Sequence, residues 1–363
     1  MKKIHCYITS LEGGGAERQM SYLCSFLSER GYDVTLVTML DVDDKYDVAN
    51  TVKRVCLGYK LSDNVILKLL KKIRIFLYFL TVRTDCVISY LIGSNAHVLR
   101  PMMFRPNVKV IVGERNFVTW ELSEEEKYIY GKLYDRANYV VSNSYSMERY
   151  LADFNPSLKP HLRTITNYTD TSKYKTTPLL LGEKLQIGVF ARFEKQKNYE
   201  RFAEMLNIVK KTNHRPFVVR WYGDKRKDSC YTHFCELIDK YSIHDLIELH
   251  DFVKDVPKAM ESIDIICLPS LYEGFSNSLS EAICSGKPVI AGEVSDNGVI
   301  VRDGFNGKLF NPSDVQDMVA QFLLIVNSDN DNLRKMSINS RKRAEELFSK
   351  DKFIESYTYL IEN

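Results

Sequence analysis

Residues 263–291 read Ile-Asp-Ile-Ile-Cys-Leu-Pro-Ser-Leu-Tyr-Glu-Gly-Phe-Ser-Asn-Ser-Leu-Ser-Glu-Ala-Ile-Cys-Ser-Gly-Lys-Pro-Val-Ile-Ala. The apolar run at 263–268 is followed by a polar loop, a helix-length segment and a second apolar run at 288–291. Strand, helix and strand in this order are typical of a βαβ unit, in which the two strands lie parallel. We therefore predict a parallel sheet covered by helices around this stretch.

The same alternation extends outward from this stretch over the whole chain, which makes the fold class α/β with doubly wound parallel sheets. Further strands of the second half are predicted at 185–190, 217–221 and 247–249. Those of the first half are predicted at 4–9, 34–38, 86–90, 108–112, 139–142 and 163–165. Helices are expected between them, and three more at 315–326, 331–347 and 352–361 close the chain.

A polar segment at 170–178 that ends in proline separates the two halves. Because 363 residues exceed what one core normally supports, we predict two domains. Residues 1–175 form the first domain, residues 176–345 form the second, and residues 346–363 form a helix that crosses back to the first. Such sheets bind ligands at the carboxyl ends of their strands, so we expect a site in a central cleft faced by both domains.

Composition describes a globular protein with little net charge. Hydrophobic residues make up 45% of the chain and charged residues 27%, with a net charge of +3. This balance gives no support to nucleic-acid binding.

The eight cysteines include no C-x-x-C pair and no histidine at zinc-like spacing. We interpret them as reduced thiols, which favours the cytoplasm. The apolar stretch at 4–11 fits a first strand better than a signal peptide. The longest other apolar run, at 75–82, is far shorter than the ~20 residues of a membrane-spanning helix.

A glycine-rich turn, Leu11-Glu12-Gly13-Gly14-Gly15, joins the first predicted strand to a helix at 16–30. A phosphate or a sugar can approach the amides of Gly14 and Gly15 closely. The alternative is a tight turn that needs positive φ. The dinucleotide motif G-x-G-x-x-G is absent, because Arg18 stands at the third glycine position.

Two basic residues follow the first strand of the second half. Arg192 and Lys197 lie where that strand ends, and together they suit a diphosphate, whose charge they can neutralise without a metal. We interpret the neighbouring Lys195 as a solvated loop residue.

Two glutamates stand eight positions apart in the opening stretch, Glu273 in the loop and Glu281 in the helix. The amides of residues 274–277 can meet phosphate or sugar oxygens, and Glu281 can accept two hydrogen bonds from a ribose diol. A purely structural interpretation is equally possible, in which Ser278-x-x-Glu281 is a capping box and Gly286 is an ordinary helix C-cap.

With these motifs in order, the sequence resembles the retaining family 4 of glycosyltransferases, which has the GT-B fold of two Rossmann-like domains. Glu273 and Glu281 match its E-x7-E signature, and Arg192 with Lys197 match its R-x4-K diphosphate clamp. The resemblance implies that Glu273, Arg192 and Lys197 are catalytic. It implies donor binding by Gly14, Gly15, Gly274, Phe275, Ser276, Asn277 and Glu281.

The resemblance also implies a substrate class. The chain would transfer a hexose or N-acetylhexosamine, with retention, from a UDP-linked sugar to a glycan acceptor in bacterial polysaccharide, O-antigen or capsule synthesis. The acceptor would be linked to undecaprenyl diphosphate. No metal or cofactor is expected, and the second half has no D-x-D between a strand and a loop.

A narrower likeness, to transferases of N-acetylhexosamines, rests on Ile88-Ser89-Tyr90 with Asn95 and on Gly113-Glu114-Arg115-Asn116. It implies an acceptor side made by Asn95, His97, Glu114, Arg115 and Asn116. His97 lies in an expected helix, where a structural role competes with a catalytic one.

Residues 64–83 combine five basic side chains with many apolar ones. Such a segment can lie on an anionic leaflet near a lipid-linked acceptor. A domain helix with solvated lysines is the alternative.

Three other functions compete with this interpretation. A GT-B nucleotide-sugar epimerase would need further carboxylates and histidines, and a NAD-dependent oxidoreductase would need the complete dinucleotide motif. A non-catalytic glycan-binding protein would lack the basic clamp.

Overall fold

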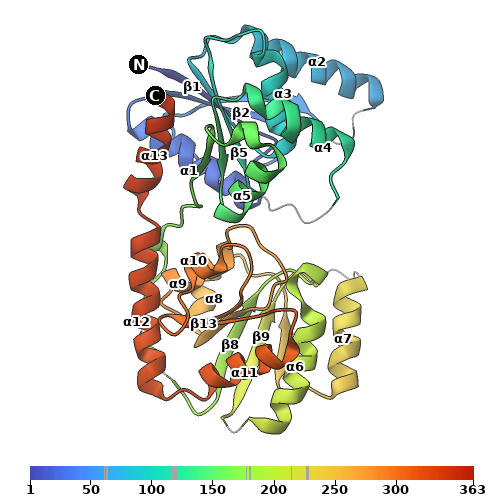
Figure 1. Cartoon of the computed structure of the whole chain (residues 1–363), viewed down its shortest axis with the longest axis vertical. Coiled ribbons are helices and arrows are strands. Elements are labelled where there is room, and N and C mark those ends of the chain that lie inside the picture. The colour runs from blue at the N-terminus through green and yellow to red at the C-terminus, as the bar shows by residue number, and fades with distance from the viewer. Residues whose placement is uncertain are drawn as a thin grey trace. The chain divides into compact units, whose positions relative to one another are not determined.

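The computed structural model describes residues 1–363 except 61, 63, 116–120, 177, 180, 214 and 226–228. The chain forms two compact units (Figure 1). Unit 1 contains Met1–Tyr168 and Lys350–Asn363, and unit 2 contains Thr169–Ser349. The sequence placed these boundaries at 175 and 345.

Unit 1 is built on a parallel sheet that has seven strands within the described residues, in the order β3-β2-β1-β4-β5-β6-β7. The strands are β1 (Lys3–Ile8), β2 (Asp33–Leu40), β3 (Lys53–Tyr59), β4 (Cys86–Tyr90), β5 (Lys109–Glu114), β6 (Tyr139–Ser142) and β7 (Leu162–Thr164). The α-helices are α1 (Gly15–Glu29), α2 (Val65–Thr81), α3 (Ile92–Met102), α4 (Glu124–Tyr128), α5 (Tyr145–Phe154) and α13 (Lys350–Glu362).

Apolar side chains cover both faces of this sheet. Cys6 and Ile8 of β1 pack in one buried cluster with residues of α1 and α13, while Tyr7 packs in the other with residues of α2 and α3. Successive side chains of a strand point to opposite faces, so a strand that is apolar throughout requires helices on both sides.

Unit 2 has a parallel sheet with six strands among the described residues, in the order β10-β9-β8-β11-β12-β13. Its strands are β8 (Leu185–Phe190), β9 (Phe217–Tyr222), β10 (Ile247–His250), β11 (Ile265–Leu268), β12 (Val289–Gly292) and β13 (Gly307–Phe310). Its α-helices are α6 (Tyr199–Thr212), α7 (Ser229–Tyr241), α8 (Val256–Glu261), α9 (Asn277–Cys284), α10 (Asn297–Ile300), α11 (Val315–Val326) and α12 (Asn330–Leu347). The predicted α/β class with two doubly wound sheets is confirmed.

The sequence missed β3 and β13, which are the edge strands of the two sheets. In β3 most side chains are at least partly exposed, and it carries Lys53, Arg54 and Gly58. β13 is only four residues long. An edge strand need not be apolar throughout, so neither segment has the pattern by which the central strands were found.

The last helix belongs to unit 1, where it lies beside α1 (Figure 1). Phe353 of α13 packs edge-on against Phe26 of α1, and the Tyr90 hydroxyl donates a 2.7 Å hydrogen bond to that of Tyr357. Residues more than 250 positions apart thus share one core.

Within the described residues, no helix is both long enough and apolar enough to cross a membrane.

Candidate functional site

The basic pair and the first glutamate follow two neighbouring strands of unit 2. β8 and β11 are parallel and paired, with Ile187 opposite Ile265. Arg192 and Lys197 follow the carboxyl end of β8, and Glu273 follows that of β11. The topology therefore brings segments about 76 residues apart to one edge of the sheet.

Lys197 and Glu273 form a largely buried ion pair at this edge. The Nζ of Lys197 lies 2.5 Å from Oε1 of Glu273, and the two side chains are 13% and 10% exposed. Removing both charges from water costs about as much as their attraction returns, so such a pair is weak evidence for stability. A role of both side chains in binding would explain the pair better than a role in stability.

Two residues that the sequence analysis did not single out hold the loops of this pair together. The Gln196 amide donates 2.8 Å to the carbonyl of Tyr272, and the Asn198 amide donates 3.1 Å to that of Pro269 and 2.8 Å to that of Pro312. Asn198 has a φ of 57°, a left-handed conformation that asparagine tolerates better than most residues. An asparagine directly before a helix-length segment is the signal in the sequence that could have identified it.

Arg192 is not part of this ion pair. Its side chain is 69% exposed, and its Nη1 lies 2.9 Å from Oε1 of Glu194. An exposed pair of this kind contributes about 0–1 kcal/mol and is easily exchanged for another anion.

The helix that carries the second glutamate begins two residues earlier than the capping-box hypothesis requires. Ser276 is the N-cap of α9, and its hydroxyl accepts a hydrogen bond from the amide of Leu279. Ser278 lies inside the helix and donates 2.8 Å to the carbonyl of Phe190. The Ser278–Glu281 capping box is therefore wrong, because Ser276 already occupies the capping position.

Glu281 is the fifth residue of α9 and is buried. In the loop before it, the ring of Phe275 packs in the core against Phe348, with ring centroids 6.2 Å apart. Among residues 274–277, Phe275 can therefore offer a ligand only its main chain.

The glycine loop lies in unit 1. Gly14 is the N-cap of α1 and Gly15 is its first residue. Gly13 has a φ of 138°, so it is at Gly13 that the turn requires glycine. A Cβ on Gly14 would lie 2.3 Å from a carboxylate oxygen of Glu17, which is the flexible end of a side chain.

Asn95 and Glu114 meet in a buried polar network of unit 1. The Asn95 amide donates to Glu114 Oε1 at 3.1 Å and to the Tyr134 hydroxyl at 2.8 Å, and Tyr134 in turn donates to Glu114. Burial raises the pKa of Glu114 to about 7, against the effect of these hydrogen bonds.

Arg115 and His97 are also held by neighbours. The Arg115 guanidinium lies 3.9 Å from the centre of the Tyr90 ring and donates to the hydroxyl of Tyr357. Tyr7 and His97 share a 3.1 Å hydrogen bond, and burial lowers the pKa of His97 to about 4. Asn116 lies outside the described residues. The acceptor roles of these residues stay predictions.

Solved structures share this architecture over the full chain. HepE of Anabaena in complex with UDP and glucose superposes with a TM-score of 0.81 and 15% identity, covering 100% of both chains. With two doubly wound parallel sheets, this likeness places the protein in the GT-B fold class.

The family follows from the sequence matches. The model described as "Glycosyltransferase Family 4" matches residues 13–173, and that described as "Glycosyl transferases group 1" matches residues 171–343. Because the two matches are contiguous and cover both halves, the chain belongs to glycosyltransferase family 4.

Curated relatives include two enzymes of bacterial glycan synthesis. A UDP-Gal:α-D-GlcNAc-diphosphoundecaprenol α-1,3-galactosyltransferase of Escherichia coli is 27% identical over 45% of this chain and 42% of its own length. An N-acetylgalactosamine-N,N'-diacetylbacillosaminyl-diphospho-undecaprenol 4-α-N-acetylgalactosaminyltransferase of Campylobacter jejuni is 24% identical over 97% of both. The chain spans 28% and 42% of the length of the first two curated relatives it matches.

Proposed function

We propose that this protein transfers a sugar, with retention of configuration, from a UDP-linked donor to a lipid-linked acceptor in bacterial surface-glycan synthesis. The observation that carries the proposal is the largely buried ion pair of Lys197 and Glu273 at the carboxyl edge of unit 2. A sugar nucleotide presents a diphosphate, which seeks a cation, and sugar hydroxyls, which seek a carboxylate. The two halves of the ion pair match these two needs.

In this mechanism the donor separates the ion pair. Lys197 turns to the diphosphate and stabilises the negative charge that develops on it as the glycosidic bond breaks. Glu273 accepts hydrogen bonds from the transferred sugar. Arg192 leaves the exposed pair with Glu194 and adds a second cation, so no metal is needed to balance the charge.

Glu281 completes donor binding through the ribose diol, to which its carboxylate can accept two hydrogen bonds. The first amides of α9, from Asn277 onward, add donors for phosphate or sugar oxygens. The acceptor hydroxyl then attacks from the face that the diphosphate leaves and passes its proton to the departing phosphate oxygen. The new bond forms on the same face as the broken one, which retains the configuration of the sugar, and UDP is released.

The donor and the stereochemistry can be tested together. Thermal shift is measured with UDP-sugars, GDP-sugars and NAD(H), and the anomeric configuration of the product is read by NMR. We expect stabilisation by a UDP-sugar and a product with the donor's configuration. A response to NAD(H) alone would refute the proposal, and release of UDP without an acceptor would favour an epimerase.

We also propose that α2 places the protein on the cytoplasmic leaflet of a membrane. Only Ile75 and Phe79 of this helix are buried. The rest of the helix exposes apolar side chains between lysines, with Val65 82%, Ile66 71% and Leu69 59% exposed. An apolar face flanked by basic residues fits an anionic lipid surface.

Liposome flotation tests this surface. Replacement of Ile66 and Leu69 by Ser should abolish binding to vesicles of phosphatidylglycerol and phosphatidylethanolamine at low salt, since it removes apolar area from the face. The matched control is Ile338→Ser, because Ile338 is 70% exposed on α12. Equal flotation of both variants, or none by the unaltered protein, would contradict the proposal.

A further inference from the structure

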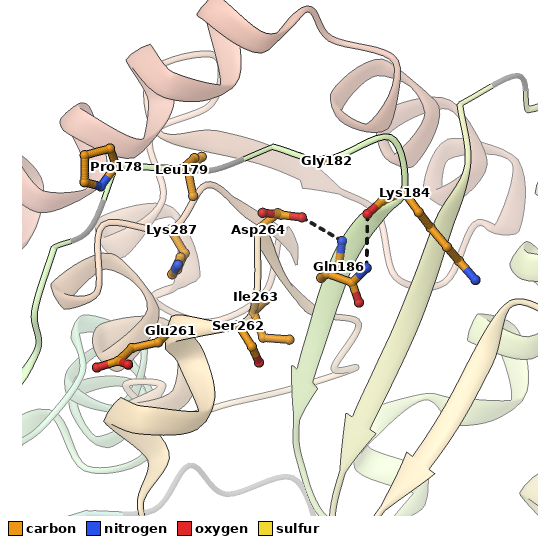
Figure 2. A pocket seen from close by; sticks show the side chains of 10 residues that line it. All are labelled: Pro178, Leu179, Gly182, Lys184, Gln186, Glu261, Ser262, Ile263, Asp264 and Lys287. Carbon is orange, nitrogen blue, oxygen red and sulfur yellow. Dashed lines mark hydrogen bonds between the residues drawn. The ribbon is translucent and has the colours of Figure 1, made fainter.

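A pocket lies in unit 2, away from the ion pair of Lys197 and Glu273 (Figure 2). Its volume is about 310 Å³. Residues just before three neighbouring strands contribute to it: Gln186 with Lys184 at the start of β8, Asp264 before β11 and Lys287 before β12. Glu261 at the end of α8 and Leu179 also line the pocket.

This pocket is at the opposite edge of the sheet from the ion pair. Because β8, β11 and β12 are parallel, their amino ends share one edge and their carboxyl ends share the other. The six residues of β8, at about 3.3 Å each, separate the two edges by about 20 Å. A ligand in this pocket would therefore not compete with one bound at Lys197.

Lys287 is held rigidly beside the pocket. Gly286, with a φ of 66°, ends α9 in a Schellman motif. In that motif the Gly286 amide donates 3.1 Å to the carbonyl of Ile283, and the Lys287 amide donates 3.0 Å to that of Ala282. Ser340 donates 2.7 Å to the Lys287 carbonyl. The C-cap interpretation of Gly286 is thus confirmed, and it fixes the backbone from which the lysine side chain extends.

The ammonium of Lys287 lacks a partner. The residue is 3% exposed, and in the described part of the chain its Nζ has neither a hydrogen bond nor an ion pair. Burial lowers the pKa of Lys287, although Asp264 and Glu261 act to raise it. Because Nζ is open to the pocket, its acceptors come from whatever fills the pocket, either water or a ligand.

The neighbouring groups need a donor. The side-chain oxygen Oε1 of Gln186 is buried without a hydrogen-bond donor. Its amide nitrogen donates 3.0 Å to the carbonyl of Lys184 with one of its two hydrogens. Asp264 accepts a 2.8 Å hydrogen bond from the Gln186 main chain on one oxygen, and burial raises its pKa (Figure 2).

The charges in the pocket cancel. Lys184 and Lys287 face Glu261 and Asp264 in the lining, so the formal sum is zero. A phosphate would satisfy Lys287, but it would leave the Gln186 oxygen without a donor and would meet two carboxylates. The hydroxyl groups of a neutral molecule can do both. They can accept a hydrogen bond from Lys287 and donate hydrogen bonds to Gln186, Asp264 and Glu261.

We propose that this pocket is a second, non-catalytic saccharide site that holds one sugar unit of a glycan. The choice of a saccharide among hydroxylated ligands rests on the proposed function. The volume is at the lower end of the range for ligand pockets, roughly 300 Å³, and suits a single ring. The site would keep a glycan on unit 2 during transfer.

Saturation-transfer NMR on the whole protein tests the site with free glucose, galactose and N-acetylglucosamine. UDP is present in excess to fill the donor site. We expect at least one of the three sugars to bind, and Lys287→Met to raise its Kd by about 10- to 100-fold, the effect of losing a charge-assisted hydrogen bond. Lys287→Gln is a second variant should the first not fold. The matched control is Lys197→Ala, which alters the opposite edge and should leave this Kd unchanged.

The outcomes separate this site from the donor site. Binding lost in Lys197→Ala and kept in Lys287→Met would overturn the proposal and leave the transferase function intact. Absence of binding by all three sugars, or displacement of the bound sugar by equimolar inorganic phosphate, would also overturn it. Binding that depends on Lys287 in a protein that transfers no sugar would support the site and refute the proposed function.

Discussion

Two lysines with little exposure lie at opposite edges of the sheet of unit 2. Lys197, at the carboxyl edge, has a carboxylate 2.5 Å from its Nζ. Lys287, at the amino edge, has no counter-charge in contact within the described residues. We propose that the paired lysine exchanges one anion for another, whereas the unpaired one takes its acceptor from a ligand in the pocket. The comparison suggests two kinds of binding site for lysines of similarly low exposure, one that exchanges anions and one that takes a neutral ligand.

The largest expected effect tests the paired lysine. Lys197→Ala should lower turnover about 100- to 1,000-fold, the usual effect of removing one donor that stabilises developing negative charge. Lys195→Ala is the matched control, because Lys195 is exposed in the same turn and should keep the unaltered rate. Steady-state rates with the donor found by thermal shift provide the measurement.

The single variant leaves Glu273 buried without a cation, which can destabilise unit 2 by itself. The double variant Lys197→Ala with Glu273→Gln removes that charge, so it should regain stability in urea without regaining turnover. If the double variant recovers the rate, the loss was structural and the clamp assignment is wrong.

Lys197 and Glu273 also show how much of the site can be predicted from the sequence. Parallel strands end at one edge, so the motif positions alone placed Lys197 and Glu273 together. The outward direction of Arg192 depends on a nearby partner, Glu194, which periodicity does not reveal. The start of α9 at Ser276 depends on which of two serines finds a tertiary acceptor, and Ser278 found the carbonyl of Phe190.

The pocket beside Lys287 could not have been predicted from the sequence. Gly286-Lys287-Pro288 indicates a helix end and the start of a strand, and both are present. The void lies between Leu179 and the residues at the amino ends of the strands, and a gap of this kind has no pattern of residues. In unit 1, likewise, motif residues Asn95 and Glu114 lie in a buried network that depends on Tyr134, about 20 residues from Glu114.

The second-largest expected effect is on stability. It concerns Glu114, a buried carboxyl that is surrounded by hydroxyl and amide groups. Burial raises the pKa of Glu114 from 4.5 to about 7, so the folded state holds this proton more tightly than the unfolded chain. Its contribution to stability is complete below about pH 4.5 and is lost as the pH rises to about 7. Glu114→Gln cannot lose a proton there, so at pH 8 it should be more stable by about 3 kcal/mol.

Urea unfolding at pH values from about 5 to 8 measures this difference. Glu121→Gln is the matched control, because Glu121 is exposed in the same unit and should keep the slope of the unaltered protein. Should Glu114→Gln lose stability with pH as steeply as the unaltered protein, the carboxyl would not be the group that titrates.

The smallest effect concerns the unpaired lysine. Lys287→Met keeps most of the length of the side chain and removes the charge, so the ligand-free protein should gain about 1 kcal/mol of stability at neutral pH. Because burial lowers the pKa of Lys287, the unfolded chain holds its proton more tightly than the folded one. The cost of the charge therefore shrinks as the pH rises toward 10.5, the ordinary lysine value, and the gain of the variant should shrink with it.

Urea unfolding at neutral and alkaline pH provides the measurement, with Lys184→Met as the control, since Lys184 lines the same pocket but is exposed. Equal stability changes in the two variants would mean that the Lys287 ammonium is solvated, and the contrast between the two edges of the sheet would then disappear.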